Sequence, residues 1–118
     1  MAQDRPDILE LLRTVEVFLQ ERAMPALDGE LAFHARVSAN LLRIAGRELR
    51  DGPAMDAAEA ERLRDLLGSD APLGEQTRRL AAAIRDGSLD GRMADVRAHV
   101  RQSVEDKLRV TNPGYLED

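Results

Sequence analysis

The stretch "LAFHARVSANLLRIAGREL", residues 31–49, decides the fold class of this chain. Its apolar residues recur at steps of three and four, which is the spacing of one face of an α-helix. Projected at about 100° per residue, the main apolar face consists of Phe33, Val37, Leu41, Ile44 and Leu49. A second, flatter face of small residues, Ala35, Ala39 and Gly46, would let another helix approach closely. The pattern predicts a central helix that is buried on most of its circumference.

Three polar residues of this helix, His34, Ser38 and Glu48, stand among or beside the apolar positions. We predict that they are buried polar residues. A carboxylate without a partner is costly to bury, so Glu48 should meet an arginine, a helix terminus or water. His34 is either a hydrogen-bonded core residue or a general base or ligand, and a lone histidine on an apolar flank favours the first role. His34 and Glu48 cannot act together, because one helix separates them by roughly 21 Å.

The opposite edge of the same helix carries a row of polar residues, Arg36, Asn40, Arg43 and Arg47, which Arg50 extends. Guanidinium groups spaced along one edge could hold a phosphate or carboxylate through paired hydrogen bonds. The chain also has 22 acidic residues, which could instead pair with these arginines along a solvated or interhelical edge. A concave pocket lined by this row would favour the interpretation as a ligand site. A convex edge whose arginines are paired with acidic residues would favour the interpretation as salt bridges.

Amphipathic helices account for the rest of the chain as well. Helical spacing and turn signals predict further helices over roughly residues 6–24, 55–67, 74–85 and 90–110. Breaks are expected at Pro25 and at "RDGP", residues 50–53. No segment alternates with period two, so no strand is predicted. About five helices with short loops predict an all-α, compact bundle that forms a single domain over residues 1–118.

The composition argues against several classes of function. The chain has 17 basic and 22 acidic residues, a net charge of -5, which disfavours binding to nucleic acid or to an anionic membrane surface. It has 2 Phe, 1 Tyr and no Trp, too few for the stacking platform of a single-stranded nucleic acid site. The chain has no cysteine, which removes disulfides, thiolate metal sites and cysteine nucleophiles.

Signatures of targeting and catalysis are absent from the sequence. The start "MAQDRPDILELL" lacks the pattern of a secretory signal, and no apolar run approaches the roughly 20 residues of a membrane span. There is no phosphate-binding loop, no zinc-binding histidine pair and no nucleophile elbow. We therefore expect a cytoplasmic protein that holds no cofactor and no metal, and for which a binding role is favoured over enzymatic activity, which stays open as a third hypothesis.

The chain resembles a bacterial family known as domain of unknown function 6285. The resemblance rests on the segments "RPDILELL", "FLQERAMPALDGELAFHARVSANLLRIAGREL", "RLRDLLG", "LAAAIRDGSLD" and "KLRVTNPGY". It implies a genomic setting beside phosphotransferases similar to aminoglycoside and choline kinases, and near acyl-CoA dehydrogenases. It implies no activity and no catalytic residues.

These observations lead to two hypotheses about function. The first is a non-catalytic helical accessory domain that binds a kinase-like or acyl-CoA dehydrogenase-like protein, or a second copy of itself as a homodimer. The second is a small-molecule module in which Arg36, Asn40, Arg43 and Arg47 hold an acidic ligand of the phosphate or acyl-CoA type.

Overall fold

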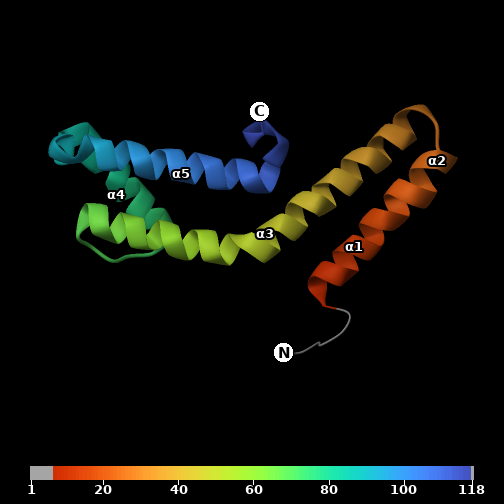
Figure 1. Ribbon diagram of the computed structural model, residues 1–118, viewed down its shortest axis with the longest axis horizontal. Coiled ribbons are helices and arrows are strands. Elements are labelled where there is room, and N and C mark those ends of the chain that lie inside the picture. The colour runs from red at the N-terminus through yellow and green to blue at the C-terminus, as the bar shows by residue number, and fades with distance from the viewer. Residues whose placement is uncertain (1–6, 118) are drawn as a thin grey trace. The chain divides into compact units, whose positions relative to one another are not determined.

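The computed structural model describes residues 7–117, and over this range the regular elements are all helical (Figure 1). The all-α prediction is therefore confirmed. In chain order the elements are α1 (Ile8–Phe18), the π-helical turn η1 (Leu19–Ala23), α2 (Met24–Ala26), α3 (Gly29–Leu67), α4 (Leu73–Asp86), the 3-10 turn η2 (Asp90–Arg92), α5 (Met93–Thr111) and the 3-10 turn η3 (Pro113–Leu116).

Contacts between residues divide the chain into two units, Met1–Gly52 and Pro53–Asp118. The first unit contains α1, η1, α2 and the first part of α3, and the second contains the rest of α3 with α4 and α5. Each unit is described by itself below. That residues 1–118 fold as a single domain stays a prediction.

The N-terminal helix continues past the proline at which it was predicted to stop. Asp7 caps α1, and its side chain accepts a hydrogen bond of 2.9 Å from the backbone N–H of Glu10. Pro25 has no N–H with which to continue the α-helical ladder. The chain accommodates it with the π-helical turn η1, where the N–H of Met24 reaches the carbonyl of Leu19, five residues back. The predicted start at residue 6 lies outside the described residues.

The break predicted at residues 50–53 is wrong, because α3 runs through this segment without interruption and includes Pro53. A proline disfavours helical geometry in the preceding residue mainly through a clash with that residue's Cβ and N–H. Here the preceding residue is Gly52, which has no Cβ. The space that a Cβ would need is occupied by Glu48, whose Oε1 would lie 2.7 Å from it. The two predicted helices, residues 31–49 and 55–67, are thus parts of one helix.

In the first unit, the face of small residues on α3 is the buried one. Ala39 is fully buried and Ala35 nearly so, where α3 runs alongside α1 (Figure 1). Leu42 and Gly46 of the same side line a groove together with Leu9 of α1. Small side chains allow two helices to approach closely, so this face forms the contact within the hairpin.

In the second unit, α4 packs with α3 and α5 around an aliphatic core. Its buried members are Leu63, Leu66, Leu80, Leu89 and Val96, with Leu67, Leu73, Ala83 and Met93 packed against them. Each such leucine contributes about 1.5–3 kcal/mol by leaving water. The connection before α4 is held by Gln76, which is 1% exposed and donates from Nε2 to the carbonyl of Ser69 at 2.6 Å. Gly87 ends α4 in the left-handed conformation, with φ of 82°.

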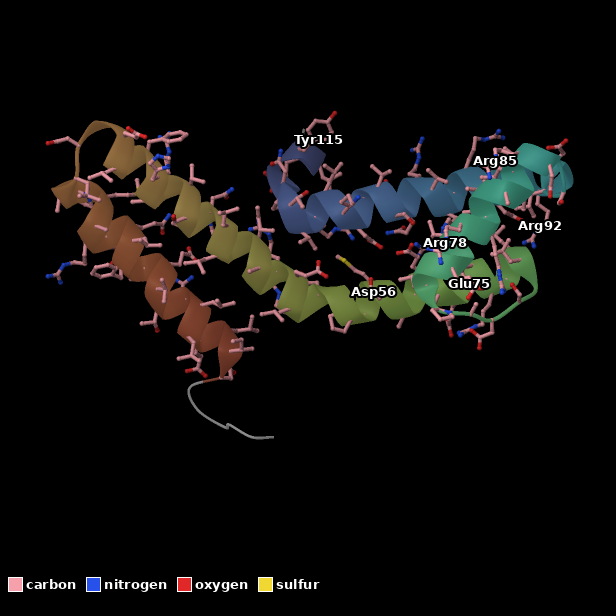
Figure 2. All side chains as sticks on the ribbon, turned by 180° about the vertical axis from the view of Figure 1, so that it is seen from behind. Asp56, Glu75, Arg78, Arg85, Arg92 and Tyr115 are labelled. Atoms are coloured by element: carbon pink, nitrogen blue, oxygen red, sulfur yellow. The ribbon has the colours of Figure 1, made fainter. Side chains whose placement is uncertain are left out.

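One arginine joins the start of α5 to α3. Arg92, labelled in Figure 2, donates from Nη1 to the carbonyl of Asp65 at 2.9 Å and from Nη2 to the carboxylate of Asp65 at 3.0 Å. The same guanidinium reaches Asp95 at 3.1 Å. The hydrogen bonds that Arg92 donates to Asp65 and Asp95 raise its pKa.

Among the described residues, no helix is long and apolar enough to cross a membrane.

Replacing Pro53 with alanine is expected to raise the free energy of unfolding by about 1 to 3 kcal/mol. Alanine has the N–H that can donate to the carbonyl of Leu49, and it removes the clash of the proline ring with the preceding turn. Urea unfolding of the full chain followed by circular dichroism measures the change. Pro72→Ala is the matched control, because Pro72 stands at the N-cap of α4 and interrupts no helix, so it should give no gain. A loss of stability in Pro53→Ala would show that α3 needs the proline.

Candidate functional site

The large apolar face of α3, predicted to be buried, is exposed in the structure. Leu41 is 59% exposed and Phe33 is 51% exposed. We name Phe33, Val37 and Leu41, which follow one another at four-residue steps, the α3 stripe. The correction has a geometric cause: the small residues on α3 face α1, and the α3 stripe lies on the opposite side of the same helix. Ile44 is half-buried, and Leu49 is exposed.

A second exposed apolar row follows α1. It consists of Ile8, Leu11, Val15 and Phe18. These residues recur at steps of three and four, so they form one face of α1. No residue of α1 is buried. The first unit therefore presents large apolar side chains to solvent on α1 and on α3, and the buried hydrophobic residues in its described part are Ala35 and Ala39.

The prediction that His34, Ser38 and Glu48 are buried is wrong for the structure of this chain. All three residues are exposed. The Nε2 atom of His34 lies 3.3 Å from Oε1 of Glu30, one helical turn earlier on the same helix. His34 and Glu48 lie on the side of α3 away from the buried alanines, and Ser38 lies on the flank of the alanine face. A catalytic or binding role for them stays a hypothesis. The carboxylate of Glu30, with which His34 interacts, is exposed, and the ring of His34 lies 5.7 Å from that of Phe33.

The predicted arginine edge of α3 is divided in the structure. Arg36 lies over the ring of Phe33, with 5.4 Å from its guanidinium carbon to the ring centroid. Asn40 is exposed. Arg43 instead reaches towards α1, where its Nη1 donates to Oε2 of Glu16 at 3.2 Å. The row of four residues therefore does not line a single pocket.

Two of the four predicted residues, Arg43 and Arg47, line a groove of about 330 Å³ between α1 and α3. Arg13 and Arg50 bring the number of guanidinium groups in its lining to four, against one carboxylate, that of Glu16. Arg50 is engaged with Asp51 through two hydrogen bonds of 3.1 Å, and this partner raises its pKa. The groove is positively charged and concave, as the ligand hypothesis requires for this part of the row.

A different polar site lies in the second unit, between α3 and α5. His99 is 5% exposed, and its Nδ1 accepts a hydrogen bond of 3.0 Å from Nε of Arg62. The same guanidinium donates from Nη2 to Oγ of Ser103 at 3.4 Å. Arg62 and His99 line a groove of about 630 Å³ whose wall is formed by the second part of α3 and by α5. A cavity of this size is typical of small-molecule sites.

The environment of His99 favours the neutral form of its ring. Burial lowers the pKa of His99, and the neighbouring charge of Arg62 lowers it further. Because Nδ1 accepts a hydrogen bond, the proton of the neutral ring belongs on Nε2. Protonation would place an N–H on Nδ1, directly against the donor of Arg62. The site thus combines a neutral histidine of defined tautomer with a cationic arginine.

No pattern in the sequence singles out this pair. His99 follows Val96 by three residues and precedes Val100 by one, which places it at the border of the apolar face of α5. That position was a usable signal of burial. Arg62 is 37 residues away in the chain, and no local pattern connects the two. The contact arises from the way α3 and α5 pack together.

The chain matches a family of known proteins over most of its length. A family described as "Domain of unknown function (DUF6285)" matches residues 25–115, which is most of the chain. No curated protein and no solved structure matches the chain. The family description names no activity, ligand or partner.

The lowered pKa of His99 predicts a specific dependence of stability on pH. Above the ordinary histidine pKa of 6.5, the ring is neutral in both the folded and unfolded chain, and its contribution to stability is fully retained. As the pH falls below that value, the unfolded chain takes up a proton before the folded chain does, so the free energy of unfolding decreases until the folded-state pKa is passed. Urea unfolding measured at a series of pH values from about 7.5 down to about 4.5 should show this loss of stability.

His99→Gln should reduce the slope of stability against pH in the acidic range, because glutamine does not titrate there. Ser103→Ala is the matched control, since it removes another neutral partner of Arg62 without removing a titrating group. Equal slopes in the original chain and in His99→Gln would contradict the assignment of a buried, neutral His99.

Proposed function

We propose that this chain, which belongs to the DUF6285 family, is a non-catalytic helical interaction domain that works bound to another protein subunit. The observation that carries the proposal is the α3 stripe, where Phe33, Val37 and Leu41 stand exposed along one side of a helix. Exposed apolar residues that adjoin one another along a helix can form a contact surface for another protein, whereas single exposed apolar residues are normal.

The energetics of the first unit support the same conclusion. A helical hairpin is stabilised mainly by the burial of its apolar faces. Among the described residues of this unit, the fully or nearly buried apolar side chains are Ala39 and Ala35, while the exposed row of α1 and the α3 stripe remain in contact with water. Covering one large side chain contributes about 1.5–3 kcal/mol. A partner that covers the α3 stripe would therefore stabilise the hairpin substantially.

A second copy of this chain is the partner that we propose. A two-fold interface uses the same patch on both subunits, and closed two-fold pairs are the commonest assemblies of small soluble proteins. The α3 stripe suits this geometry because its three members repeat at one helical turn, so two antiparallel copies can interdigitate along it. The resemblance to phosphotransferase-associated domains makes a kinase-like or acyl-CoA dehydrogenase-like protein the heteromeric alternative for the same surface.

A second function is favoured by the arginine groove between α1 and α3. Four guanidinium groups and one carboxylate line it, which gives the lining an excess of positive charge. Such a groove can hold a phosphate or another acidic group of a small molecule. Arg36 and Asn40, which were predicted to share this role, lie outside it. The candidate ligand site therefore comprises Arg13, Arg43, Arg47 and Arg50.

Leu41→Arg is expected to separate a homodimer into monomers while leaving the helix content unchanged. The original chain should scatter light as a particle of twice 13.1 kDa, and its unfolding midpoint should rise with protein concentration. Leu31→Arg is the matched control, because Leu31 is exposed on the same helix but outside the α3 stripe. A monomeric chain that also shows no Leu41-dependent binding to a co-expressed kinase-like or dehydrogenase-like neighbour would contradict the proposed function.

The arginine groove makes a separate prediction for anion binding. Titration of the full chain with inorganic pyrophosphate should shift the amide resonances of the residues that line the groove, and Arg43→Gln should weaken this binding by about tenfold. Arg36→Gln is the control, since Arg36 does not line the groove. If both variants bind as the original chain does, pyrophosphate associates with surface charge in general and the groove is not a ligand site.

A further inference from the structure

The groove of the second unit contains a hydrogen-bond donor that the protein leaves unused. Nε2 of His99 carries the ring proton, and among the described residues no acceptor is found for it. Every buried side-chain nitrogen and oxygen atom of the described residues has a partner, so Nε2 is not sealed in the core. Because His99 lines the groove and is otherwise buried, this N–H opens towards the groove.

The same groove holds a positive charge that no carboxylate neutralises. Arg62 is half-buried, and its two hydrogen-bond partners, His99 and Ser103, are both neutral. In the part of the chain that the structure describes, no acidic side chain forms an ion pair with it. A guanidinium with neutral partners keeps most of its electrostatic attraction for an anion.

Three aspartates also line the groove, and each already has a cationic partner. Asp65 and Asp95 share the guanidinium of Arg92, at 3.0 Å and 3.1 Å. Asp106 accepts from Nε2 of Gln102 at 2.9 Å and lies 3.4 Å from Nη1 of Arg109. The three aspartates thus carry three negative charges, and their partners Arg92 and Arg109 supply two positive charges, so the positive charge of Arg62 brings the whole group to balance.

The rest of the lining is apolar and small. It consists of Ala54, Met55, Ala58, Leu66 and Ala98. These side chains offer no hydrogen bonds and leave room in a groove of about 630 Å³, so they suit an aliphatic group. A ligand that uses the whole lining needs an anionic head with an acceptor oxygen and a short hydrocarbon tail.

We propose that the groove between the second part of α3 and α5 binds a small aliphatic carboxylate, whose oxygens accept from Nε2 of His99 and from Arg62. The tail of the acid lies against Met55 and the alanines of the two helices. This site is distinct from the α3 stripe and from the arginine groove, both of which belong to the first unit. It holds a ligand whether or not the chain associates with a partner.

Titration of the full chain with sodium hexanoate, followed by nuclear magnetic resonance of the two histidine rings, tests the proposal. Hexanoate should saturate and shift the ring signals of His99. Hexan-1-ol and hexylamine, which have the same tail with a neutral or a cationic head, should bind at least about tenfold more weakly. Equal binding of hexan-1-ol would show that the groove selects only the tail. Stronger binding of hexylamine would show that the aspartates determine which head group the groove prefers. Either of these two results overturns the proposal, and so does the absence of saturable hexanoate binding.

Variants identify the groups that hold the acid. Arg62→Gln should weaken hexanoate binding by about tenfold or more. Arg101→Gln, an exposed arginine on the same helix as His99 and outside the groove, should leave it unchanged. His99→Gln keeps a donor near Nε2 and should bind within a few fold of the original chain, whereas His99→Phe should bind weakly. Should His99→Phe fail to fold, the comparison of Arg62→Gln with Arg101→Gln still decides. Hexanoate binding that is lost in Arg43→Gln and kept in Arg62→Gln would place the acid in the other groove and overturn the proposal.

Discussion

The close contact between the small face of α3 and α1 determines what the first unit presents to its surroundings. A helix packs only one of its sides against a given neighbour, and the side of α3 that packs against α1 contains Ala35 and Ala39. The large residues Phe33, Val37 and Leu41 are then turned to the opposite side, and the intrahelical spacing of side chains leaves no alternative. The exposed stripe is thus a direct consequence of which face packs, and it is the feature on which the proposed association rests.

The second unit is organised differently, because its helices bury leucine and valine rather than alanine. Its core around Leu63 resembles that of an ordinary small helical domain, and its polar groups are closely matched. Gln76 is satisfied by the segment before α4, and Arg92 satisfies two aspartates at the start of α5. Against this background of paired groups, Nε2 of His99 and the charge of Arg62 stand out as groups directed at the groove rather than at the protein.

The two units therefore offer different chemistry on one chain. The first has apolar rows and an arginine groove, which suit a protein surface or a strongly acidic group. The second has a stable core and a groove with one donor, one cation and an aliphatic wall. Binding is accordingly the common theme of both proposals.

The sequence alone was sufficient for the helical class of the fold, because a repeat of three and four residues is incompatible with strands and persists along the whole chain. The segments that carry the family resemblance and the balance of charges were also readable without coordinates.

Three features depended on tertiary structure. Whether the alanine face or the leucine face of α3 is buried depends on its neighbour α1, and periodicity marks both faces equally. The continuity of α3 through Pro53 depends on two opposing effects: Gly52 has no Cβ to clash with the proline ring, but Pro53 cannot donate a backbone hydrogen bond. The helix propensities of single residues predict the outcome of this balance poorly. The pairing of Arg62 with His99 spans 37 residues, and only the packing of α3 with α5 brings these two side chains within hydrogen-bonding distance.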